Sequence, residues 1–529
     1  MSSRMRNQKN KLRRDQFFNF VSSNIGKTLQ PSQKKIFKEY LFKIAGIFYG
    51  CALGEIIGKQ GNNKTHKRML NDFPDEIIPF PTEYRRKMPP GRWTENTAQL
   101  ILIMDMLAEN EENEYGSNWE TDLNNFAKKL KRWNKNGFRK LGDDCGLGID
   151  DITSRVINKP HFISNPKIMA IEAYRELGSN RAPNGCLIRG VLTAVLRDHE
   201  KAALDMASCT HADPRCLAAT TVIDSIISFL LRCNVNELSI EWMTDSNIAK
   251  YILEPSRKYV KNSKRNNLIS EYDKYSKIAL MPLVVESEKQ NKTEKDQNDD
   301  TDQDNSDQND NTDQDTDQDT SDQEGDFSDN DTKQETEETP SEELENSKSS
   351  NKKRKKKGKK KSVKFKKTKK KPHLGFLPMG GLEDDESDSI ESLSDPNNDV
   401  DLPEESGTLL GCLKLDNEQD MQSKDYCLKT MVCAVWAFRK VRDFLDDLMY
   451  EIAEVGMNQI EAHEKINKFF KETISEIVKR GGDSKTNAAL VGAILGCAFL
   501  YIDLPDDWVL KILDKDWSDQ KLKNLFWSL

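Results

Sequence analysis

The segment 285–406 most constrains what this chain can fold into, because its composition forbids a packed core. Stretches such as Asp299–Asp307 contain almost no apolar side chains, so they cannot bury enough surface to offset the entropy lost on ordering. A lysine-rich block, Lys352–Lys371, follows the acidic part, and acidic residues return at Glu383. We therefore expect this segment to be disordered. Its composition explains why 32% of the residues of the whole chain are charged and only 36% are hydrophobic.

The pieces on either side of this segment predict one folded domain that it interrupts. Residues 39–284 and 407–529 together are long enough for one large core, and residues 1–38 read as a basic N-terminal extension. A long surface insertion is tolerable because loop-closure entropy grows only logarithmically with length. The alternative is two independent domains on a linker, which is disfavoured because motifs that look like parts of one site occur in both pieces.

Hydrophobic periodicity predicts an all-α fold of many packed helices. Apolar residues recur at i, i+3 and i+4 along Leu41–Ala52 and again along Ala98–Leu107. Alternating strand patterns are scarce. Further helices are expected over residues 166–177, 187–197, 214–231, 423–451 and 460–479.

Small residues repeat about every fourth position in two of the expected helices. They are Gly46, Gly50, Gly54 and Gly58 in the first, and Ala488, Gly492 and Gly496 in the second. Glycine inside a helix costs about 1 kcal/mol relative to alanine, so a compensating interaction is expected. Close backbone approach of crossing helices would supply it, and direct contact with a ligand is the alternative.

Cysteine usage and terminal sequence favour a reducing, intracellular compartment, cytoplasmic or nuclear. The ten cysteines form no CxxC pair, so free thiols explain them better than disulfides or zinc. Residues 1–14 are polar and basic, without the apolar core of a secretory signal. The strongest apolar run, Ala488–Ile502, is shorter than the roughly 20 residues that span a bilayer, so no membrane association is expected.

Two short polar motifs lie almost four hundred residues apart, Trp93–Thr97 (WTENT) and Gly481–Asn487 (GGDSKTN). Each directly precedes an apolar run at helical spacing. Each motif is therefore expected to place its polar side chains at a helix N-terminus, where backbone N–H groups and the helix dipole favour anions.

These two motifs and four other segments, in the same order along the chain, resemble the ADP-ribosylglycohydrolase family. The family patterns are an opening helix ending in G-D-A-x-G, then W-T-D-D-T, N-G-x-x-M-R, T-H-x-D/N, a G-Y-V-x-x-T helix, and G-G-D-T-D-T-N with a P-x-x-W tail. The matching segments here are Gly46–Gly58 with Glu55 in place of aspartate, Trp93–Thr97, Asn184–Arg189, Thr210–Pro214, Asp425–Phe438, and Gly481–Gly496 followed by Leu504–Trp508.

The resemblance implies a reaction and a set of site residues. The reaction is hydrolysis of the glycosidic bond that joins ADP-ribose to a protein side chain or a small acceptor, assisted by two Mg²⁺ or Mn²⁺ ions. Glu95 and Asp483 would be the catalytic carboxylates, and Asn184, Gly185, Arg189 and His211 would line the ADP-ribose cleft. A hydrogen-bonded structural histidine and a structural ion pair are the alternatives for His211 and Arg189. The implied metal ligands are Thr94, Glu95, Asn96, Asp483 and Thr486, with Lys485 at a former ligand position.

Substitutions at the implied ligand positions change the expected chemistry. Three of the four family aspartates are replaced, by Glu95, Asn96 and Lys485, so the formal ligand charge changes from −4 to about −1. An ammonium has no lone pair to give a metal. Lys485 is therefore expected to replace one cation, which leaves one weakly held ion or none.

Two functions follow from the altered motifs, and the sequence alone leaves both open. One is an ADP-ribosyl glycohydrolase whose site is modified and whose activity is reduced or lost. The other is a catalytically inactive protein that binds ADP-ribose or serves as an interaction scaffold.

The basic block Lys352–Lys371 also has two interpretations. Its fifteen lysines and arginines are sufficient for nuclear import, or for nonspecific contact with nucleic acid or another acidic partner. Alternatively, the block folds back on the acidic tract beside it. Phe365 is the only aromatic residue in it, so it provides no stacking platform for single strands.

Overall fold

A computed structural model of the chain describes residues 30–74, 77, 89–109, 119–233, 243–282 and 424–529. Within these residues the protein is helical, with no strand and a single isolated β-bridge between Pro183 and Tyr426. The all-α prediction is confirmed. The segment 285–406, including the basic block Lys352–Lys371, lies outside the described residues. Its expected disorder therefore stays a prediction.

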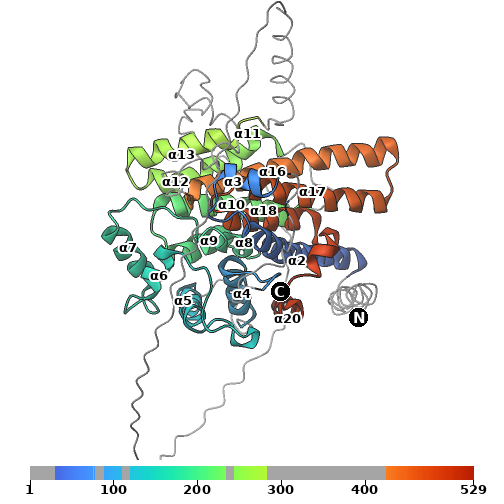
Figure 1. Ribbon diagram of the computed structural model, residues 1–529. Helices are drawn as coiled ribbons and strands as arrows, with labels where there is room; N and C mark the ends of the chain where they lie inside the picture. The colour runs from blue at the N-terminus through green and yellow to red at the C-terminus, as the bar shows by residue number, and fades with distance from the viewer. Residues whose placement is uncertain (1–29, 75–76, 78–88, 110–118, 234–242, 283–423) are drawn as a thin grey trace, which may run out of the picture. The chain divides into compact units, whose positions relative to one another are not determined.

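The α-helices pack in several layers around two buried central helices (Figure 1). In chain order they are α2 (Pro31–Gly58), α3 (His66–Asp72), α4 (Glu95–Ala108), α5 (Trp119–Asn136), α6 (Asp151–Ile157), α7 (Pro166–Glu176), α8 (Arg189–Thr193), α9 (His199–Ser208), α10 (Pro214–Arg232), α11 (Asp245–Ile248), α12 (Glu254–Lys261), α13 (Asn266–Ala279), α16 (Cys427–Tyr450), α17 (Gln459–Lys479), α18 (Ser484–Phe499), α19 (Asp506–Val509) and α20 (Lys515–Ser528). Short 3₁₀ turns at Arg139–Leu141 and Tyr501–Asp503, and π-helical turns at Ala249–Leu253 and Glu451–Val455, complete the described helical structure.

Helices α2 and α18 lie side by side at the centre of the fold and touch through their backbones. A Cβ atom on Gly50 would lie 2.0 Å from the carbonyl oxygen of Gly492, and one on Gly54 would lie 1.8 Å from that of Ala488. Only glycine allows such an approach. Close helix crossing, the first of the two explanations for the small-residue repeats, is therefore confirmed.

Helices α2 and α10 are each long and apolar enough to cross a membrane, judged by length and composition alone. Both are core helices here. The whole apolar window of α2 and 78% of that of α10 are buried inside the protein, as expected for the central helices of a helical core.

Helices from before and after the segment 283–423 share one core. Arg439 of α16 forms a two-point ion pair with Asp245, at 2.9 and 2.8 Å, and donates to the backbone carbonyls of Ala279 and Met281 at 3.1 and 2.6 Å. Helix α20 packs on α4, where Lys521 lies 2.6 Å from Asp105. These contacts agree with a single interrupted domain, while the boundaries at 39–284 and 407–529 remain a prediction.

Of the five further helices that the sequence predicted by range, four follow the prediction and one does not. Helices α7, α10, α16 and α17 end within a few residues of the expected positions. The single helix expected over 187–197 is instead the five-residue α8, followed by α9 from His199. The N–H groups of Val195 and Leu196 bond to carbonyls three residues earlier. This tighter pattern ends the α-helix.

Candidate functional site

The two polar motifs meet in space at the N-termini of α4 and α18. The ammonium of Lys485, in the first turn of α18, forms an ion pair with the carboxylate of Glu95, the first residue of α4. Only 13% of the lysine side chain and 10% of the glutamate side chain are exposed. Residues 390 positions apart in sequence therefore form one buried polar cluster, as the sequence predicts.

Glu55 of α2 caps the N-terminus of α4. Its Oε1 accepts from Thr94 Oγ1 at 2.6 Å and from the Asn96 backbone N–H at 3.0 Å, and its Oε2 accepts from the N–H and Oγ1 of Thr97 at 3.1 and 2.7 Å. An anion at this position satisfies N–H groups that have no partner within the helix. Burial would raise the pKa of Glu55, but the Lys485 ammonium and these donors outweigh it and lower the pKa. Glu55 is thus a structural carboxylate whose two oxygens are both occupied.

The surroundings of Glu95 shift its pKa in the opposite direction from that of Glu55. Burial raises its pKa to about 7, and the Glu55 carboxylate adds to the rise, against the attraction of Lys485. Its Oε2 is buried without a hydrogen-bond partner in the described part of the chain. Burial would also lower the pKa of Lys485, but Glu95, Asp483 and Glu55 outweigh it and raise the pKa. Lys485 is therefore a charged ammonium among three carboxyl groups.

Gly148, in the loop before α6, packs against the carboxylate of Glu95. A Cβ on Gly148 would lie 1.8 Å from Glu95 Oε2, and its φ of +87° is in the left-handed region that favours glycine. The sequence analysis missed this residue. The available signal was a Gly-Leu-Gly-Ile-Asp-Asp run, in which glycine stands two residues before a helix-capping aspartate.

Asp483 joins the second motif to the Asn-Gly segment. It caps α18 by accepting from the Thr486 N–H at 3.3 Å, and it also accepts from Asn184 Nδ2 at 2.9 Å. The same Asn184 amide donates to Thr430 Oγ1 at 2.9 Å, and that hydroxyl donates to Asn487 Oδ1 at 2.8 Å. The structure therefore brings Asn184, Asp483 and Thr486 together, as expected for residues of one site.

Asp150 and His211 form the far side of this cluster, beside Gly185. A Cβ on Gly185 would lie 2.2 Å from Asp150 Oδ2, and Asp150 Oδ1 lies 3.9 Å from His211 Nε2. The Nδ1 of His211 is 2.8 Å from Thr210 Oγ1, whereas its buried Nε2 has no hydrogen-bond partner among the described residues. Burial would lower the pKa of His211, but Cys186 and Asp150 outweigh it and raise the pKa. Asp150 is a second residue that the sequence analysis missed.

Arg189 lies behind this cluster instead of at its surface. The residue is fully buried, its Nε donates to Gln99 Oε1 at 2.6 Å, and its Nη1 donates to the Met206 carbonyl and to Thr210 Oγ1 at 2.9 and 2.8 Å. The guanidinium also lies 5.5 Å from the centre of the Phe126 ring. No carboxylate pairs with it among the described residues, so the structural ion pair considered for Arg189 is not found there. Arg189 positions Thr210, and through it His211.

The residues present do not fit a centre of two divalent ions. Both oxygens of Glu55 accept hydrogen bonds, the Asn96 amide donates to Glu55 at 3.2 Å, and the Lys485 ammonium occupies one oxygen of Glu95. Magnesium requires several oxygen donors in near-octahedral geometry. The described residues contain no group of three or more His, Cys, Asp or Glu side chains that could hold a metal ion.

The fold and the site define a helical protein whose polar cluster joins the N-termini of α4 and α18. A model of the ADP-ribosylglycohydrolase family matches residues 38–293 and 384–527, and the chain belongs to that family. The gap in the match falls within the expected insert. The chain is also similar to a solved structure described as an "ADP-ribosylglycohydrolase-related protein complex", with 14% identity, a TM-score of 0.40, and a match that covers 93% of this chain and 99% of the other. No curated protein matches the chain.

Proposed function

We propose that this protein binds ADP-ribose, free or attached to an acceptor, without metal ions and without efficient hydrolysis. The observation that carries the proposal is the buried ion pair between Lys485 and Glu95. It places a fixed positive charge within the residues that, in the family, are expected to hold divalent ions.

A lysine ammonium supplies only part of what a divalent ion supplies. It neutralises nearby carboxylates and donates three hydrogen bonds, so it can help to hold a ligand's hydroxyl groups. It cannot lower the pKa of a bound water as a divalent ion does. Binding is therefore expected to survive the exchange of metal for lysine, while the attack by water is expected to be weakened.

Polar groups next to the ion pair support recognition of a ligand. His211 Nε2 is buried without a hydrogen-bond partner in the described residues. It lies beside Asp150 and the Asn184-Gly185 segment. A buried polar atom without a partner is costly unless something satisfies it. A hydrogen bond from a bound ligand would do so.

A hydrolase with an altered mechanism is the second candidate, because the pKa values of two neighbouring carboxyl groups are pushed apart. Glu55 has a lowered pKa, whereas that of Glu95 is raised to about 7. A carboxyl group with a pKa near 7 is suited to act as a general acid, whereas Glu55, whose two oxygens cap α4, keeps its structural role. In this candidate Glu95 would donate a proton to the leaving group.

Calorimetry and a hydrolysis assay on the full chain test the proposal together. We expect ADP-ribose to bind equally well in EDTA and in magnesium. Lys485→Gln should weaken binding by roughly 10- to 100-fold, since a charge-assisted hydrogen bond is worth roughly 1.5–3 kcal/mol. Lys67→Gln, which removes an exposed lysine of α3, is the matched control.

Two results would decide against the binding proposal. Rapid, magnesium-dependent release of ADP-ribose from a modified peptide would establish the ordinary family reaction. Release in EDTA that is lost in Glu95→Gln, but not in Lys67→Gln, would establish the altered hydrolase.

A further inference from the structure

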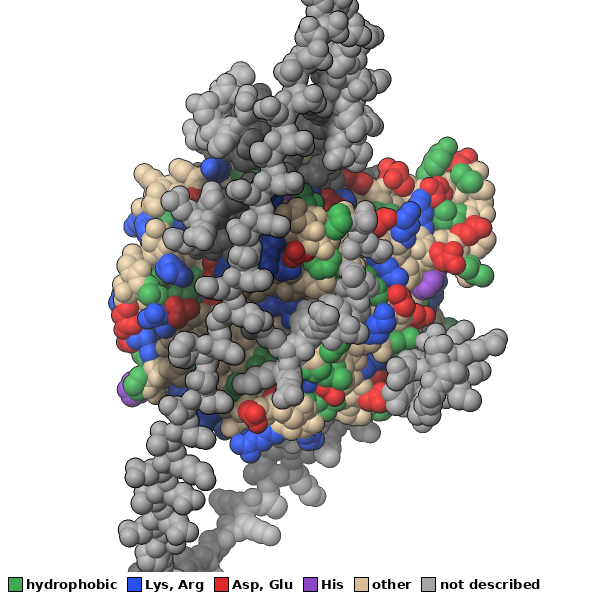
Figure 2. All heavy atoms as spheres, viewed as in Figure 1, with side chains coloured by type: hydrophobic (Ala, Val, Ile, Leu, Met, Phe, Trp, Pro, Cys, Tyr) green, Lys and Arg blue, Asp and Glu red, His purple; other side chains and the backbone are tan. Residues whose placement is uncertain are grey.

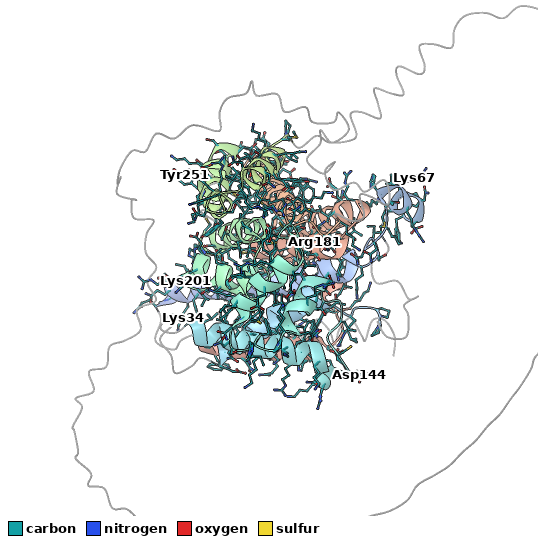
Figure 3. The ribbon with its side chains drawn as sticks, turned by 90° about the vertical axis from the view of Figure 1, so that its left-hand side faces the viewer. Lys34, Lys67, Asp144, Arg181, Lys201 and Tyr251 are labelled. Carbon is teal, nitrogen blue, oxygen red and sulfur yellow. The ribbon has the colours of Figure 1, made fainter. Side chains whose placement is uncertain are left out.

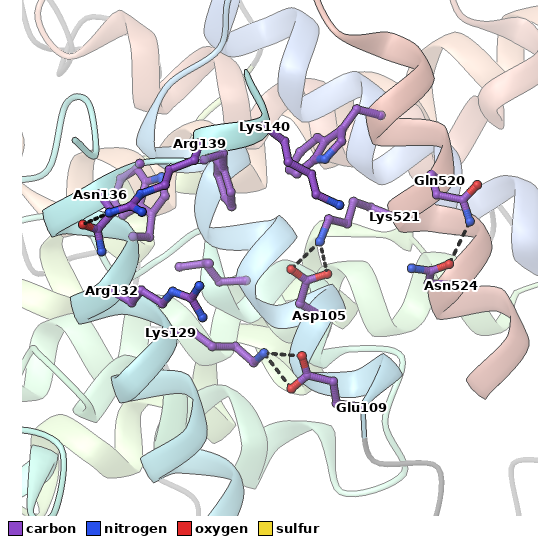
Figure 4. Close-up of a pocket in the computed structure, with 15 residues that line it drawn as sticks. Asp105, Glu109, Lys129, Arg132, Asn136, Arg139, Lys140, Gln520, Lys521 and Asn524 are labelled. Atoms are coloured by element: carbon purple, nitrogen blue, oxygen red, sulfur yellow. Dashed lines mark hydrogen bonds and ion pairs between the residues drawn. The ribbon is translucent and has the colours of Figure 1, made fainter. Parts of the chain in front are cut away.

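A hollow lies at the opposite end of α4 from the ion pair. It encloses about 510 Å³ between the C-terminal half of α4, helix α5, the 3₁₀ turn Arg139–Leu141 and α20 (Figure 4). Glu95 and Asp105 are ten residues apart on α4, or about 15 Å along a helix that rises 1.5 Å per residue. The hollow is therefore separate from the candidate site, and its volume is typical of a small-molecule pocket.

The side chains that line this pocket carry an excess of positive charge. The five cations are Lys129, Arg132, Arg139, Lys140 and Lys521, against the carboxylates of Asp105 and Glu109. Both carboxylates are already paired: Glu109 lies 2.7 Å from the Lys129 ammonium, and Asp105 lies 2.6 Å from that of Lys521.

Three pocket cations therefore have no carboxylate partner within the described residues. Arg139 donates only to the neutral amide of Asn136, at 3.2 Å, and neither Arg132 nor Lys140 has an ion pair or hydrogen bond there. All three are exposed, and Figure 4 shows them around one opening. The charge count excludes residues 110–118, which the structure does not describe. On the face seen in Figure 2, Lys, Arg, Asp and Glu side chains are interspersed.

Aromatic rings line the pocket and the hollow that adjoins it. Trp133, Phe138 and Trp517 pack in a row, with ring centres 6.3 and 5.1 Å apart. An adjoining hollow of about 400 Å³ shares Asp105 and Lys521 with the pocket and adds Trp527, which is 61% exposed. These rings give the pocket an apolar lining beside its cations, and the exposed indole offers a face on which a base can stack.

We propose that this pocket binds a diphosphate group, either free or as part of a nucleotide. Clustered guanidinium and ammonium groups repel one another, and a diphosphate relieves the repulsion while accepting several charge-assisted hydrogen bonds. The planar guanidinium groups of Arg132 and Arg139 match phosphate oxygens in two-point contacts. Trp527 lines the adjoining hollow, and in this proposal it stacks on a base attached to that diphosphate.

Lysine footprinting on the full chain tests the proposal residue by residue. The acetylation rate of Lys140 is measured by mass spectrometry with and without pyrophosphate, in parallel with ADP. Lys67 and Lys201, exposed on other parts of the molecule (Figure 3), serve as internal references. Because the readout is local, phosphate bound by the block Lys352–Lys371 does not interfere, and neither does a ligand bound at Lys485.

We expect pyrophosphate to slow acetylation of Lys140 by about fivefold or more while Lys67 and Lys201 are unchanged, and the effect to weaken with salt. Arg132→Gln with Arg139→Gln should abolish this protection. The control variant, Arg68→Gln with Arg175→Gln, removes two exposed charges elsewhere and should retain it. Circular dichroism of each variant verifies that the helices remain.

Comparison of ADP with pyrophosphate shows whether the ligand is a nucleotide or a free diphosphate. If ADP protects Lys140 at lower concentration than pyrophosphate, and Trp527→Ala removes that advantage, the ligand is a nucleotide. Equal protection by both identifies a free diphosphate. Protection of Lys140 no greater than that of Lys67, or protection that persists without Arg132 and Arg139, would overturn the proposal.

Discussion

Gly46 and Gly496 touch backbone to backbone: a Cβ atom added to either glycine would lie 1.9 Å from the carbonyl oxygen of the other. This contact fixes the crossing of α2 and α18. Helix α2 carries Glu55, and α18 follows Asp483 and carries Lys485. The crossing therefore also sets the positions of the carboxylates and the ammonium of the candidate site.

Replacing Gly496 by alanine should destabilise the fold severely. The added methyl group would meet a backbone carbonyl, which cannot rotate away as a side chain can, so α2 and α18 must separate. We expect a loss of about 3 kcal/mol or more in the free energy of unfolding, measured by urea denaturation.

Gly456→Ala is the matched control for Gly496→Ala. Gly456 has open space around its Cβ position but a φ of +79°, so alanine there costs only backbone strain, about 1–2 kcal/mol. Equal losses in the two variants would mean that close packing is not what requires glycine at 496.

The protonation of Glu95 should make stability depend on pH. Its pKa is about 7 in the folded protein, against an ordinary value of 4.5. Between these values the folded state binds more protons than the unfolded state, so this contribution is complete below pH 4.5 and is lost as pH rises through 7. The loss amounts to roughly 3 kcal/mol.

Comparison with Glu95→Gln isolates that contribution. We expect the stability of the natural chain relative to the variant to fall between pH 5 and pH 8, as measured by denaturant unfolding at each pH. Parallel curves, or a difference that grows with pH, would contradict the raised pKa of Glu95.

Restoring the family's aspartates should create a magnesium site. The triple variant Glu95→Asp, Asn96→Asp and Lys485→Asp removes the ammonium and adds carboxylates that repel one another until a cation binds. A ligand at 100 times its Kd stabilises the folded state by about 2.7 kcal/mol, so the Tm should rise with magnesium.

Two controls make the magnesium result specific. The natural chain should show little shift, and Lys485→Gln, which removes the charge without adding a ligand, should show little more. A magnesium-dependent Tm in the natural chain as large as that in the triple variant would show that Lys485 does not stand in for a cation.

Replacing residues 286–405 by a short Gly/Ser linker should leave the helical core intact. Loop-closure entropy changes by only about 0.6 kcal/mol for each doubling of loop length, so the shortened chain should be at most about 1–2 kcal/mol more stable. Circular dichroism and the Tm provide the measurement. A broad, non-cooperative transition would show that this segment stabilises the core.

The sequence alone predicted the helical class, the limits of helices α7, α10, α16 and α17 to within a few residues, and the convergence of the two polar motifs. The class and the limits follow from local spacing, whereas the convergence followed from the family resemblance. Apolar spacing fixes the buried face of helices such as α10 and α16, and the repeat of glycines at every fourth position marks the α2 face that α18 must contact. The order of the motifs along the chain indicated the family.

Only the tertiary structure decided how the polar side chains are used. Glu55 was expected simply to occupy an aspartate position, yet both its oxygens cap α4. Gly148 and Asp150 became part of the site only when their loop was seen against Glu95 and Gly185. Such hydrogen bonds and pKa shifts depend on burial and on the orientation of groups far apart in sequence, such as Glu95 and Lys485, which are 390 residues apart. Residue type and local spacing record neither.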